Sequence, residues 1–416
     1  MHVCVIGAGV VGLCSALELS AVADRVTVIE TQPGVGLGTS RANGGQLSYA
    51  HVAPLAGPGV LGRVPGWLLD PDAPLRFTPR LSADFWRWCS RFILACNRTR
   101  SRQTTEALIR LGALSRELMS DFVDRHGDAG FSYRHNGKMV ITRATATLAG
   151  LEATREFQAG LGCEQSLLDA AACLAAEPAL ASIAHELAGG LFTPSEAVAD
   201  CRLFCERLRD LFGAGDNRVD VRTGERVLGL VRNGDRIDAV RIGDDELRAD
   251  AFVVCAGLAS RELLARVGVK LPLLGLKGYS LTAPLRDPQA APARSITDAD
   301  HRIVFARLDD SLRVAGMIDL GQESDRIPTR RIQTLRRQAA STFGAAADYD
   351  AAEIWTGLRP ASPHGRPIVD RAGAENLWLN VGHGILGFTF GLGTARLLAT
   401  LVSGAAPDID PTPYRL

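Results

Sequence analysis

The chain opens on an apolar run that is broken by glycines and followed by a second apolar run. Residues 3–6 are mostly β-branched, residues 10–19 carry apolar side chains at helical spacing, and residues 25–30 read "RVTVIE". This order predicts a strand, a glycine turn, a helix and a second strand. A secretory signal is not expected, because no basic segment precedes the apolar run and Glu18 interrupts it.

The glycines of this turn have the spacing of a dinucleotide-binding fingerprint. Gly7, Gly9 and Gly12 form G-x-G-x-x-G, and Glu30 ends the second strand eighteen residues after Gly12. In this pattern the first glycine permits a tight turn, the second lets the backbone approach a pyrophosphate, and the third lets helix and strand pack closely. The helix N-terminus favours phosphate, and Glu30 is expected to bind a ribose diol.

The rest of the chain alternates between helical and strand-like segments. Residues 54–79 are rich in proline and glycine, and helices are expected from Ser82, as N-cap, to Asn97 and over 104–125. Later segments such as 302–308 and 311–321 alternate like strands of an antiparallel sheet.

The interleaved pattern predicts two discontinuous domains and a fold that is α/β and α+β. A Rossmann-like nucleotide-binding domain is expected from residues 1–50, 199–268 and 352–416. A substrate domain on a mixed, largely antiparallel sheet is expected from residues 51–198 and 269–351. An active site is expected where the two meet.

Composition narrows the class of protein. The chain has 416 residues, is 46% apolar, and has 46 basic and 46 acidic side chains, so its formal net charge is zero. Nothing in this balance favours a nucleic acid partner. Nine scattered cysteines lack zinc-ligand spacing, so no metal site is expected and we interpret them as reduced core residues of a cytoplasmic protein.

A second glycine turn near the C-terminus indicates which nucleotide binds. The segment "NLWLNVGHGILGFTFGLG" predicts a strand, a turn and a helix whose N-terminus lies near Gly384. A long ligand held at one end by residues 7–30 and at the other near Gly384 fits FAD, because the helix dipole would favour negative charge on a reduced flavin. No second G-x-G-x-x-G is present for direct NAD binding.

These motifs resemble those of a known family. The segments "VIGAGVVG", "GTSRANGGQLS", "GGLFTPSEAVADC", "LKGYSLT", "WTGLRP" and "NVGHGILGFT" are similar, in order and spacing, to the FAD-dependent D-amino-acid dehydrogenases of the small-subunit type, within the glycine oxidase and D-amino-acid oxidase superfamily. The family form of the second segment has S-A-N-A-G-Q, so Arg41 and Gly44 depart from it, which weakens inference about the substrate side chain.

The resemblance implies a set of FAD contacts beyond the first turn. The loop after Glu30 would pass under the pyrophosphate and reach the isoalloxazine, with Gln46 beside the flavin and Tyr49 and His51 in the pocket. His383, between two glycines, is expected to contribute a backbone contact and a structural side chain rather than acid–base chemistry. The full expected set is Gly7, Gly9, Val10, Val11, Gly12, Glu30, Thr39, Ser40, Asn43, Gly45, Gln46, Leu47, Val227, Ala256, Gly257, Gly382, His383, Gly384, Ile385 and Leu386.

The expected catalytic residues are Arg359, Tyr279, Gln46 and Tyr49. A flavin amine dehydrogenase needs the Cα–H of its substrate aimed at flavin N5, so orientation contributes most. The guanidinium of Arg359, in "GLRP", matches a substrate carboxylate in a bidentate way, and Tyr279 is expected to add a second donor or to pack as an ordinary strand tyrosine. Asp319 and Lys277 stay unassigned.

The resemblance implies oxidative deamination of a D-amino acid, with electrons passed to a quinone or similar acceptor. Two alternatives stay open: a dehydrogenase or oxidase of a cyclic secondary amine such as a D-hydroxyproline, and a flavin-carrying subunit without activity. The oligomeric state is not indicated.

Aromatic and basic residues between positions 63 and 93 raise a further alternative. They could form a surface that binds lipid headgroups at the inner face of the membrane, or they could be core residues of the substrate domain. The apolar members are Trp67, Leu68, Leu69, Phe77, Phe85, Trp86, Trp88, Phe92 and Ile93, and the basic ones are Arg63, Arg76, Arg80, Arg87 and Arg91. The resemblance favours a peripheral membrane contact.

Overall fold

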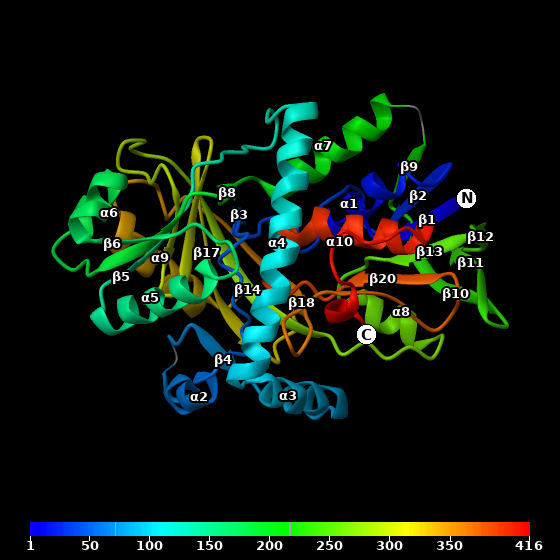
Figure 1. The fold of residues 1–416 in the computed structure, drawn as a ribbon, viewed down its shortest axis with the longest axis horizontal. Helices are drawn as coiled ribbons and strands as arrows, with labels where there is room; N and C mark the ends of the chain where they lie inside the picture. The colour runs from blue at the N-terminus through cyan, green and yellow to red at the C-terminus, as the bar shows by residue number, and fades with distance from the viewer. Residues whose placement is uncertain (71, 216–217) are drawn as a thin grey trace.

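Two large sheets organise the molecule, which is a computed structural model describing residues 1–70, 72–215 and 218–416 (Figure 1). The first sheet has six strands in the order β19-β20-β13-β1-β2-β9. All neighbours in it are parallel except the edge pair β19 and β20. Its strands are β1 (His2–Ile6), β2 (Arg25–Glu30), β9 (Val219–Thr223), β13 (Ala251–Val254), β19 (Ile368–Arg371) and β20 (Leu377–Val381).

Helices from distant parts of the chain form one apolar core with this sheet. Helix α1 packs against α10, and α10 packs in turn against α4, the long helix in the middle of Figure 1. The central parallel strands β1, β2 and β13 are mostly buried, which explains why their sequences are mostly apolar runs. The helices are α1 (Val10–Leu19), α4 (Arg98–His126), α7 (Cys201–Ala214) and α10 (Gly387–Ser403).

A small antiparallel sheet packs with α8 against a separate core that includes the other side of the parallel sheet. A turn at Asn233, Gly234 and Asp235 joins its first two strands, as the N-G-D sequence suggests. The elements are β10 (Val227–Asn233), β11 (Arg236–Ile242), β12 (Asp245–Arg248) and α8 (Ala259–Ala265).

The second large sheet has nine strands and is mostly antiparallel, as predicted. Eight follow the order β18-β14-β17-β16-β15-β5-β7-β6, and β4 pairs with β17. Only the β15–β5 and β17–β4 pairs are parallel among those described. The strands are β4 (Leu75–Phe77), β5 (Lys138–Thr142), β6 (Ser166–Asp169), β7 (Gly189–Thr193), β14 (Leu274–Pro284), β15 (Ser295–Asp298), β16 (Ile303–Leu308), β17 (Ser311–Leu320) and β18 (Glu353–Ala361).

Further helices and a short ribbon surround this sheet. Helix α9 packs on β14 and β17, while α2 and α3 lie together at the lower edge of Figure 1. The two-stranded ribbon of β3 and β8 lies beside β16. The bounds are α2 (Val60–Leu69), α3 (Ala83–Ala95), α5 (Thr145–Ala159), α6 (Ala170–Ala176), α9 (Thr329–Phe343), β3 (Gln46–Leu47), β8 (Ala197–Val198), and the 3-10 helices η1 (Pro178–Ile183), η2 (Gly384–Leu386) and η3 (Thr412–Tyr414).

Two segments belong to a different part of the fold from the one that the sequence predicts. Strand β18 pairs with β14, so residues 353–361 belong to the nine-stranded sheet and not to the nucleotide-binding part that was expected to begin at residue 352. Helix α4, expected in the substrate part, shares a core with α1 and α10. Helical or strand periodicity does not reveal which of two cores an apolar face meets. The division into two domains is otherwise a prediction.

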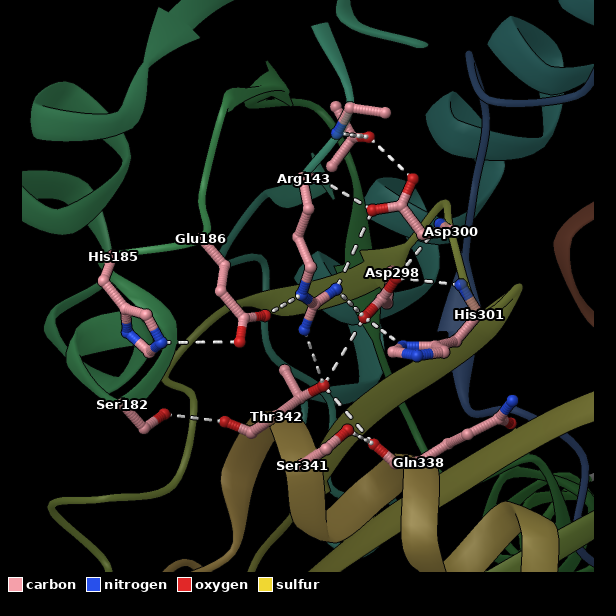
Figure 2. A network of polar contacts seen from close by, with 12 residues as sticks. Arg143, Ser182, His185, Glu186, Asp298, Asp300, His301, Gln338, Ser341 and Thr342 are labelled. Carbon is pink, nitrogen blue, oxygen red and sulfur yellow. Dashed lines mark hydrogen bonds and ion pairs between the residues drawn. The ribbon is translucent and has the colours of Figure 1, made fainter.

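A network of charged side chains around the buried Asp298 connects β5, β15 and α9 at one end of the nine-stranded sheet (Figure 2). Arg143 donates to Asp298 over 2.7 Å and to Glu186 over 2.9 Å, and His301 Nδ1 lies 2.9 Å from the same Asp298 carboxylate. Thr342 of α9 joins the network through Asp298. Every charge in it therefore has a partner within the protein.

One described segment, Gly384–Ser403, is long and apolar enough to span a membrane. It comprises η2 and α10, and 61% of its most apolar window is buried among other elements. Its contacts with α1 and α4 explain its composition, because a helix that is covered on most sides is apolar on most sides.

Candidate functional site: a nucleotide cradle beside an unpaired arginine

The three positions of the first turn call for glycine for different structural reasons. Gly7 has a φ of +107°, and a Cβ there would lie 2.8 Å from the Cys255 carbonyl oxygen. A Cβ on Gly12 would lie 1.8 Å from the Gly7 carbonyl oxygen. A Cβ on Gly9 would meet only Ser40 Oγ, at the ordinary distance of 3.4 Å. Packing within the protein therefore requires the first and third glycines, and leaves at the second an open approach that fits a pyrophosphate.

Residues around this turn present donors and a carboxylate in the expected places. Ser40 Oγ accepts the backbone N–H of Val10 at the start of α1, over 3.1 Å. Glu30 accepts the backbone N–H of Ala8 over 2.7 Å and of Gln32 over 2.8 Å. Each carboxylate oxygen can accept a second hydrogen bond, so the Glu30 side chain fits a ribose diol as well.

The loop after β2 leads from this turn to the nine-stranded sheet. Thr39 Oγ1 donates to the Leu358 carbonyl over 3.0 Å, and Asn43 Oδ1 accepts the Gly45 N–H over 3.0 Å. Gln46 Nε2 donates to the Ile296 carbonyl over 3.1 Å. These side chains thus brace the loop between the two sheets, and Leu47 is fully buried behind it.

Three further positions expected to contact the cofactor, Val227, Ala256 and Gly257, lie near the carboxyl ends of strands of the parallel sheet. The Glu225 N–H donates to the Glu30 carbonyl over 2.9 Å, which brings the start of β10, with Val227, beside the end of β2. Ala256 and Gly257 follow β13, and the Ala256 Cα lies 3.1 Å from where a Gly7 Cβ would be. All three positions therefore surround the nucleotide turn.

The C-terminal glycine turn lies at the end of β18. Gly382 and Gly384 have φ of +82° and +56°, and residues 361 and 383 form a β-bridge. His383 Nε2 lies 3.0 Å from Thr394 Oγ1, and burial lowers the pKa of His383 to about 3. The imidazole is therefore neutral and structural, and Ile385 and Leu386 begin the helix beyond it.

Arg359 is a half-buried cation without a carboxylate partner among the described residues. Its guanidinium donates to the Met317 carbonyl over 3.2 Å, and no described carboxylate forms an ion pair with it. Burial lowers the pKa of Arg359 to about 10, so it is charged near neutral pH. A buried charge that lacks a partner is costly, and an incoming carboxylate would remove that cost.

The backbone around Arg359 is shaped to receive its side chain. A Cβ on Gly278 of the neighbouring strand would lie 2.2 Å from Arg359 Cζ, so this glycine provides the space that the guanidinium fills. Opposite Gly278, Met317 and Ile318 of β17 form a bulge, with Met317 at a φ of +59°. The bulged residue supplies the carbonyl that accepts from Arg359.

Tyr279 does not lie with Arg359, contrary to the expectation that both would bind one carboxylate. Residue 276 of β14 faces Arg359, and residue 279 faces Thr356. Because side chains alternate along a strand, Tyr279 projects from the opposite face of the sheet. Its hydroxyl donates to Asp319 Oδ2 over 2.6 Å. Tyr279 is therefore a packed strand tyrosine on an interior strand of the sheet.

Tyr49 lies in the apolar core, and its hydroxyl has no partner within the described chain. Burial raises the pKa of Tyr49 well above its usual range, so it is neither an acid nor a base at neutral pH. Burial and the nearby Lys138 lower the pKa of His51 to about 3. The structure gives neither side chain a contact with the Arg359 site.

Two buried charged residues that sequence reasoning missed hold the segment 48–51. Lys138 Nζ donates to Ser48 Oγ over 2.8 Å, and Glu196 accepts the backbone N–H of Ala50 over 2.7 Å. Burial lowers the pKa of Lys138 to about 8 and raises that of Glu196. The only signal in the sequence was a lysine within the strand-like run "KMVIT".

A pocket opens beside the row of residues that carries Arg359. Its walls come from the segment 52–56, α3, the ends of β14 and β18, and the turn 383–386. The lining is Val52, Ala53, Pro54, Leu55, Ala56, Trp88, Phe92, Leu108, Leu276, Ile318, Ala361, Ser362, Pro363, Gly365, His383, Gly384, Ile385 and Leu386.

The aromatic segment divides between core and surface. Phe85 and Trp88 of α3 are buried against β14 and β18, whereas Trp86, Ile93 and Leu94 are 50%, 52% and 63% exposed. The side chains of Arg63, Trp67, Leu68 and Leu69, which the expectation also included, lie outside the described part of the structure.

Comparison with known proteins agrees with this arrangement. The family described as "FAD dependent oxidoreductase" matches residues 2–401. Similar proteins include "D-amino acid dehydrogenase 2" of Ralstonia nicotianae, 46% identical with 100% of both chains covered, and "D-amino acid dehydrogenase 2" of Pseudomonas aeruginosa, 44% identical with 99% of this chain and 97% of that one covered.

Solved structures share the fold at low sequence identity. Glycine oxidase from Geobacillus kaustophilus superposes with a TM-score of 0.75 at 20% identity, covering 100% of this chain and 97% of that one. L-proline dehydrogenase from P. horikoshii gives 0.76 at 14% identity, covering 100% and 96%. These likenesses establish the architecture of two sheets.

Proposed function

The chain belongs to the family of FAD-dependent oxidoreductases, and we propose that it is a D-amino-acid dehydrogenase. The observation that carries this proposal is Arg359, a half-buried cation with no carboxylate partner among the described residues. It lies at the carboxyl-terminal end of a strand that meets the nucleotide-binding part. Relatives called D-amino acid dehydrogenase, which are 35–46% identical over nearly the whole chain, support it.

FAD fits the cradle that these residues form. Gly9 leaves the approach for the pyrophosphate, Glu30 binds the ribose, and the loop from Thr39 to Leu47 follows the cofactor toward the nine-stranded sheet. The turn 382–386 would hold the far end of the cofactor with backbone groups. When bound, FAD would supply the hydride acceptor of the reaction.

Arg359 binds the substrate carboxylate and thereby fixes the direction of the Cα–H bond. The Cα–H bond breaks and its electron pair leaves as hydride, while the amine lone pair forms the C=N bond and one N–H proton goes to solvent. Water then hydrolyses the imine to a 2-oxo acid and ammonia. No acid–base residue is assigned to these steps, because orientation supplies most of the rate.

A substrate panel tests this proposal. The purified holoenzyme is offered D-amino acids, their L-enantiomers and D-hydroxyprolines with an artificial electron acceptor. We expect turnover of primary D-amino acids and at least a tenfold lower kcat/KM for the L-enantiomers. Exclusive turnover of a D-hydroxyproline would assign the cyclic-amine reaction instead, and no turnover with bound FAD would indicate a flavin-carrying subunit.

The exposed side of α3 supports a second part of the proposal, that electrons pass to a quinone at the inner face of the membrane. Trp86, Ile93 and Leu94 are exposed apolar side chains on one helix, and Arg91 is exposed among them. Aromatic and basic residues together favour the headgroup layer of an anionic bilayer.

Vesicle binding tests the membrane contact. We expect the protein to cosediment with vesicles containing anionic lipid in a salt-sensitive way, and the double variant Trp86→Ser, Leu94→Ser to lose this binding. Leu167→Ser, at an exposed leucine of β6, is the matched control and should bind normally. Fast peroxide formation in air without reduction of a quinone analogue would assign the enzyme as an oxidase and contradict this part.

A further inference from the structure

An ion pair between Arg313 and Asp200 joins three parts of the molecule that are far apart in the sequence. Arg313 lies in β17 of the nine-stranded sheet, and Asp200 is the residue before α7, which packs in the core of the parallel sheet. Arg313 Nη2 donates to Asp200 Oδ2 over 3.0 Å, and Arg313 Nη1 donates to the Asn43 carbonyl over 3.1 Å. Asn43 belongs to the loop after β2. One guanidinium therefore connects this loop with both large sheets.

The carboxylate of this pair is held from its other side as well. Asp200 Oδ1 accepts the backbone N–H of Arg202 over 2.9 Å and that of Leu203 over 3.1 Å, so it caps α7. The side chains of Arg313 and Asp200 are only 7% and 12% exposed. A buried ion pair adds little net stability over apolar packing, but it can fix one arrangement of the elements that it joins.

The loop 42–46 lies directly on the nine-stranded sheet beside this ion pair. Ser280 Oγ of β14 donates to the Ala42 carbonyl over 2.7 Å. A Cβ on Gly44 would lie 3.0 Å from Cγ2 of Val304 in β16, so the loop backbone is in close contact with that strand. A small displacement of the loop toward the sheet is blocked there, and a displacement away from the sheet is opposed by the two side-chain donors.

The face of the sheet that holds this loop also carries Arg359. The Arg359 guanidinium lies over Gly278 of β14. Ser280 and Thr282 follow at intervals of two residues, so they face the same way, and Thr282 is paired with Arg313 of β17. The groups that hold the loop and the guanidinium that is proposed to hold the substrate therefore share one rigid surface.

From this geometry we propose that Arg313 and Asp200 are positioning residues for FAD. They hold the loop 42–46, a part of the FAD cradle, in one place against the sheet, and so fix the cradle relative to Arg359. The part of this inference that concerns retention of FAD is independent of which amine is oxidised. The part that concerns Arg359 rests on the proposed function.

Release of FAD from the holoenzyme tests the first part. Arg313→Lys keeps a positive charge near Asp200, but an ammonium lacks the planar fork that also reaches the Asn43 carbonyl. We expect FAD to dissociate at least about tenfold faster, the scale of one lost hydrogen bond from a charged group. The measurement is the rise of flavin fluorescence after dilution of the holoenzyme, with far-UV circular dichroism showing that the fold is kept.

Arg143→Lys is the matched control for this measurement. Arg143 also pairs with carboxylates of the nine-stranded sheet, but they lie at the end of the sheet shown in Figure 2. The same change of guanidinium to ammonium should lower the urea midpoint there and leave the rate of FAD dissociation unchanged.

Asp200→Asn tests whether the two residues act together. The amide oxygen can still cap α7, while the charge that attracts Arg313 is lost. We expect faster FAD dissociation in this variant too. In the double variant with Arg313→Lys, the rate should increase by less than the product of the two single effects, because both substitutions break one interaction.

The second part is tested by steady-state kinetics at saturating FAD. Arg313→Lys should lower kcat for a D-amino acid about tenfold with little change in KM, because the substrate is still held but the reacting atoms are less well aligned. The visible circular dichroism of the bound flavin should change as well. Unchanged kcat and an unchanged flavin spectrum would overturn this part.

A purely structural role gives a different result. In that case Arg313→Lys and Asp200→Asn would lower the urea midpoint and release FAD at the rate of Arg143→Lys, which would overturn the proposal. Absence of turnover with any D-amino acid in the wild-type holoenzyme would contradict the proposed function instead, and the rates of FAD dissociation would still decide whether Arg313 and Asp200 position the cradle.

Discussion

The arginines on the two faces of the β14–β18 strand pair differ in the partners of their guanidinium groups. On the face covered by α9, Arg331 and Asp319 are each 1% exposed and form an ion pair, and Tyr279 donates to the same carboxylate. On the other face, Arg359 donates to the Met317 carbonyl and pairs with no carboxylate of the described residues. In the Arg331 arrangement each charge has its partner. The Arg359 arrangement has no described anion, as expected of a site that binds one.

Arg143 extends the comparison to the far end of the same sheet. It contacts Asp298, Asp300 and Glu186, so it resembles Arg331 and not Arg359 (Figure 2). Arg331 and Arg143 thus each pair with a carboxylate, whereas no described carboxylate pairs with Arg359, the residue that the sequence motifs assign to the substrate.

Arg359→Ala provides the largest test of this difference. We expect kcat/KM to fall by about two to four orders of magnitude, because a charged contact and the orientation it provides are both lost. Flavin content, read from the absorption spectrum, should stay near that of the wild type. Arg359→Lys should recover only part of the loss, since an ammonium lacks the planar fork. An unchanged kcat/KM would place the carboxylate elsewhere.

Arg331→Ala should affect stability instead of catalysis. It leaves Asp319 buried without its cation, which costs about 3–5 kcal/mol of unfolding free energy. Arg359→Ala leaves no carboxylate behind and should cost much less in the same urea titration. Equal losses in the two variants would show that Arg359 is structural too.

Gly278→Ala displaces the guanidinium of Arg359 while keeping its charge. The new Cβ would lie 2.2 Å from Arg359 Cζ, and the guanidinium can move because it ends a flexible side chain. We expect kcat/KM to fall about 10²-fold, the scale of a displacement of about 1 Å, with little change in stability. Gly229→Ala is the control, because a Cβ at that strand glycine meets nothing within 4 Å.

The sequence predicts the nucleotide turn and Arg359 better than it predicts the face of the sheet that carries Tyr279. The turn at Gly7 to Gly12 and Arg359 were found because their local spacing carries the chemistry. Tyr279 was misplaced because assigning a side chain to one face of a sheet requires the register with β18, where its partner Thr356 lies 77 residues away along the chain. Lys138, Glu196 and the bulge at Met317 were missed because long-range pairing creates them. Residues 353–361 were assigned to the nucleotide-binding part for the same reason, because their pairing with β14 is long-range.

Acid should weaken the Figure 2 network in a defined window. Burial opposes ionisation of Asp298, but hydrogen bonds from His301 and Arg143 outweigh it and lower its pKa from 3.8 to about 2. A lowered carboxyl pKa contributes stability above the unfolded value, and this contribution is lost as pH falls from about 4 to about 2. We expect a loss of about 2 kcal/mol in that window, absent in Asp298→Asn, measured by urea unfolding at each pH.

Tyr279→Phe should give the smallest effect. It tests most directly on which face of the sheet the tyrosine hydroxyl makes its contact. The variant removes the hydroxyl that donates to Asp319 over 2.6 Å, and Arg331 still pairs with that carboxylate. We expect a loss of about 1.5 kcal/mol in unfolding free energy, typical of a hydrogen bond to a charged group. Because Tyr279 projects away from Arg359, KM for a D-amino acid should not change. A raised KM with unchanged stability would instead place the hydroxyl at the substrate carboxylate, and would contradict the register that separates the two faces.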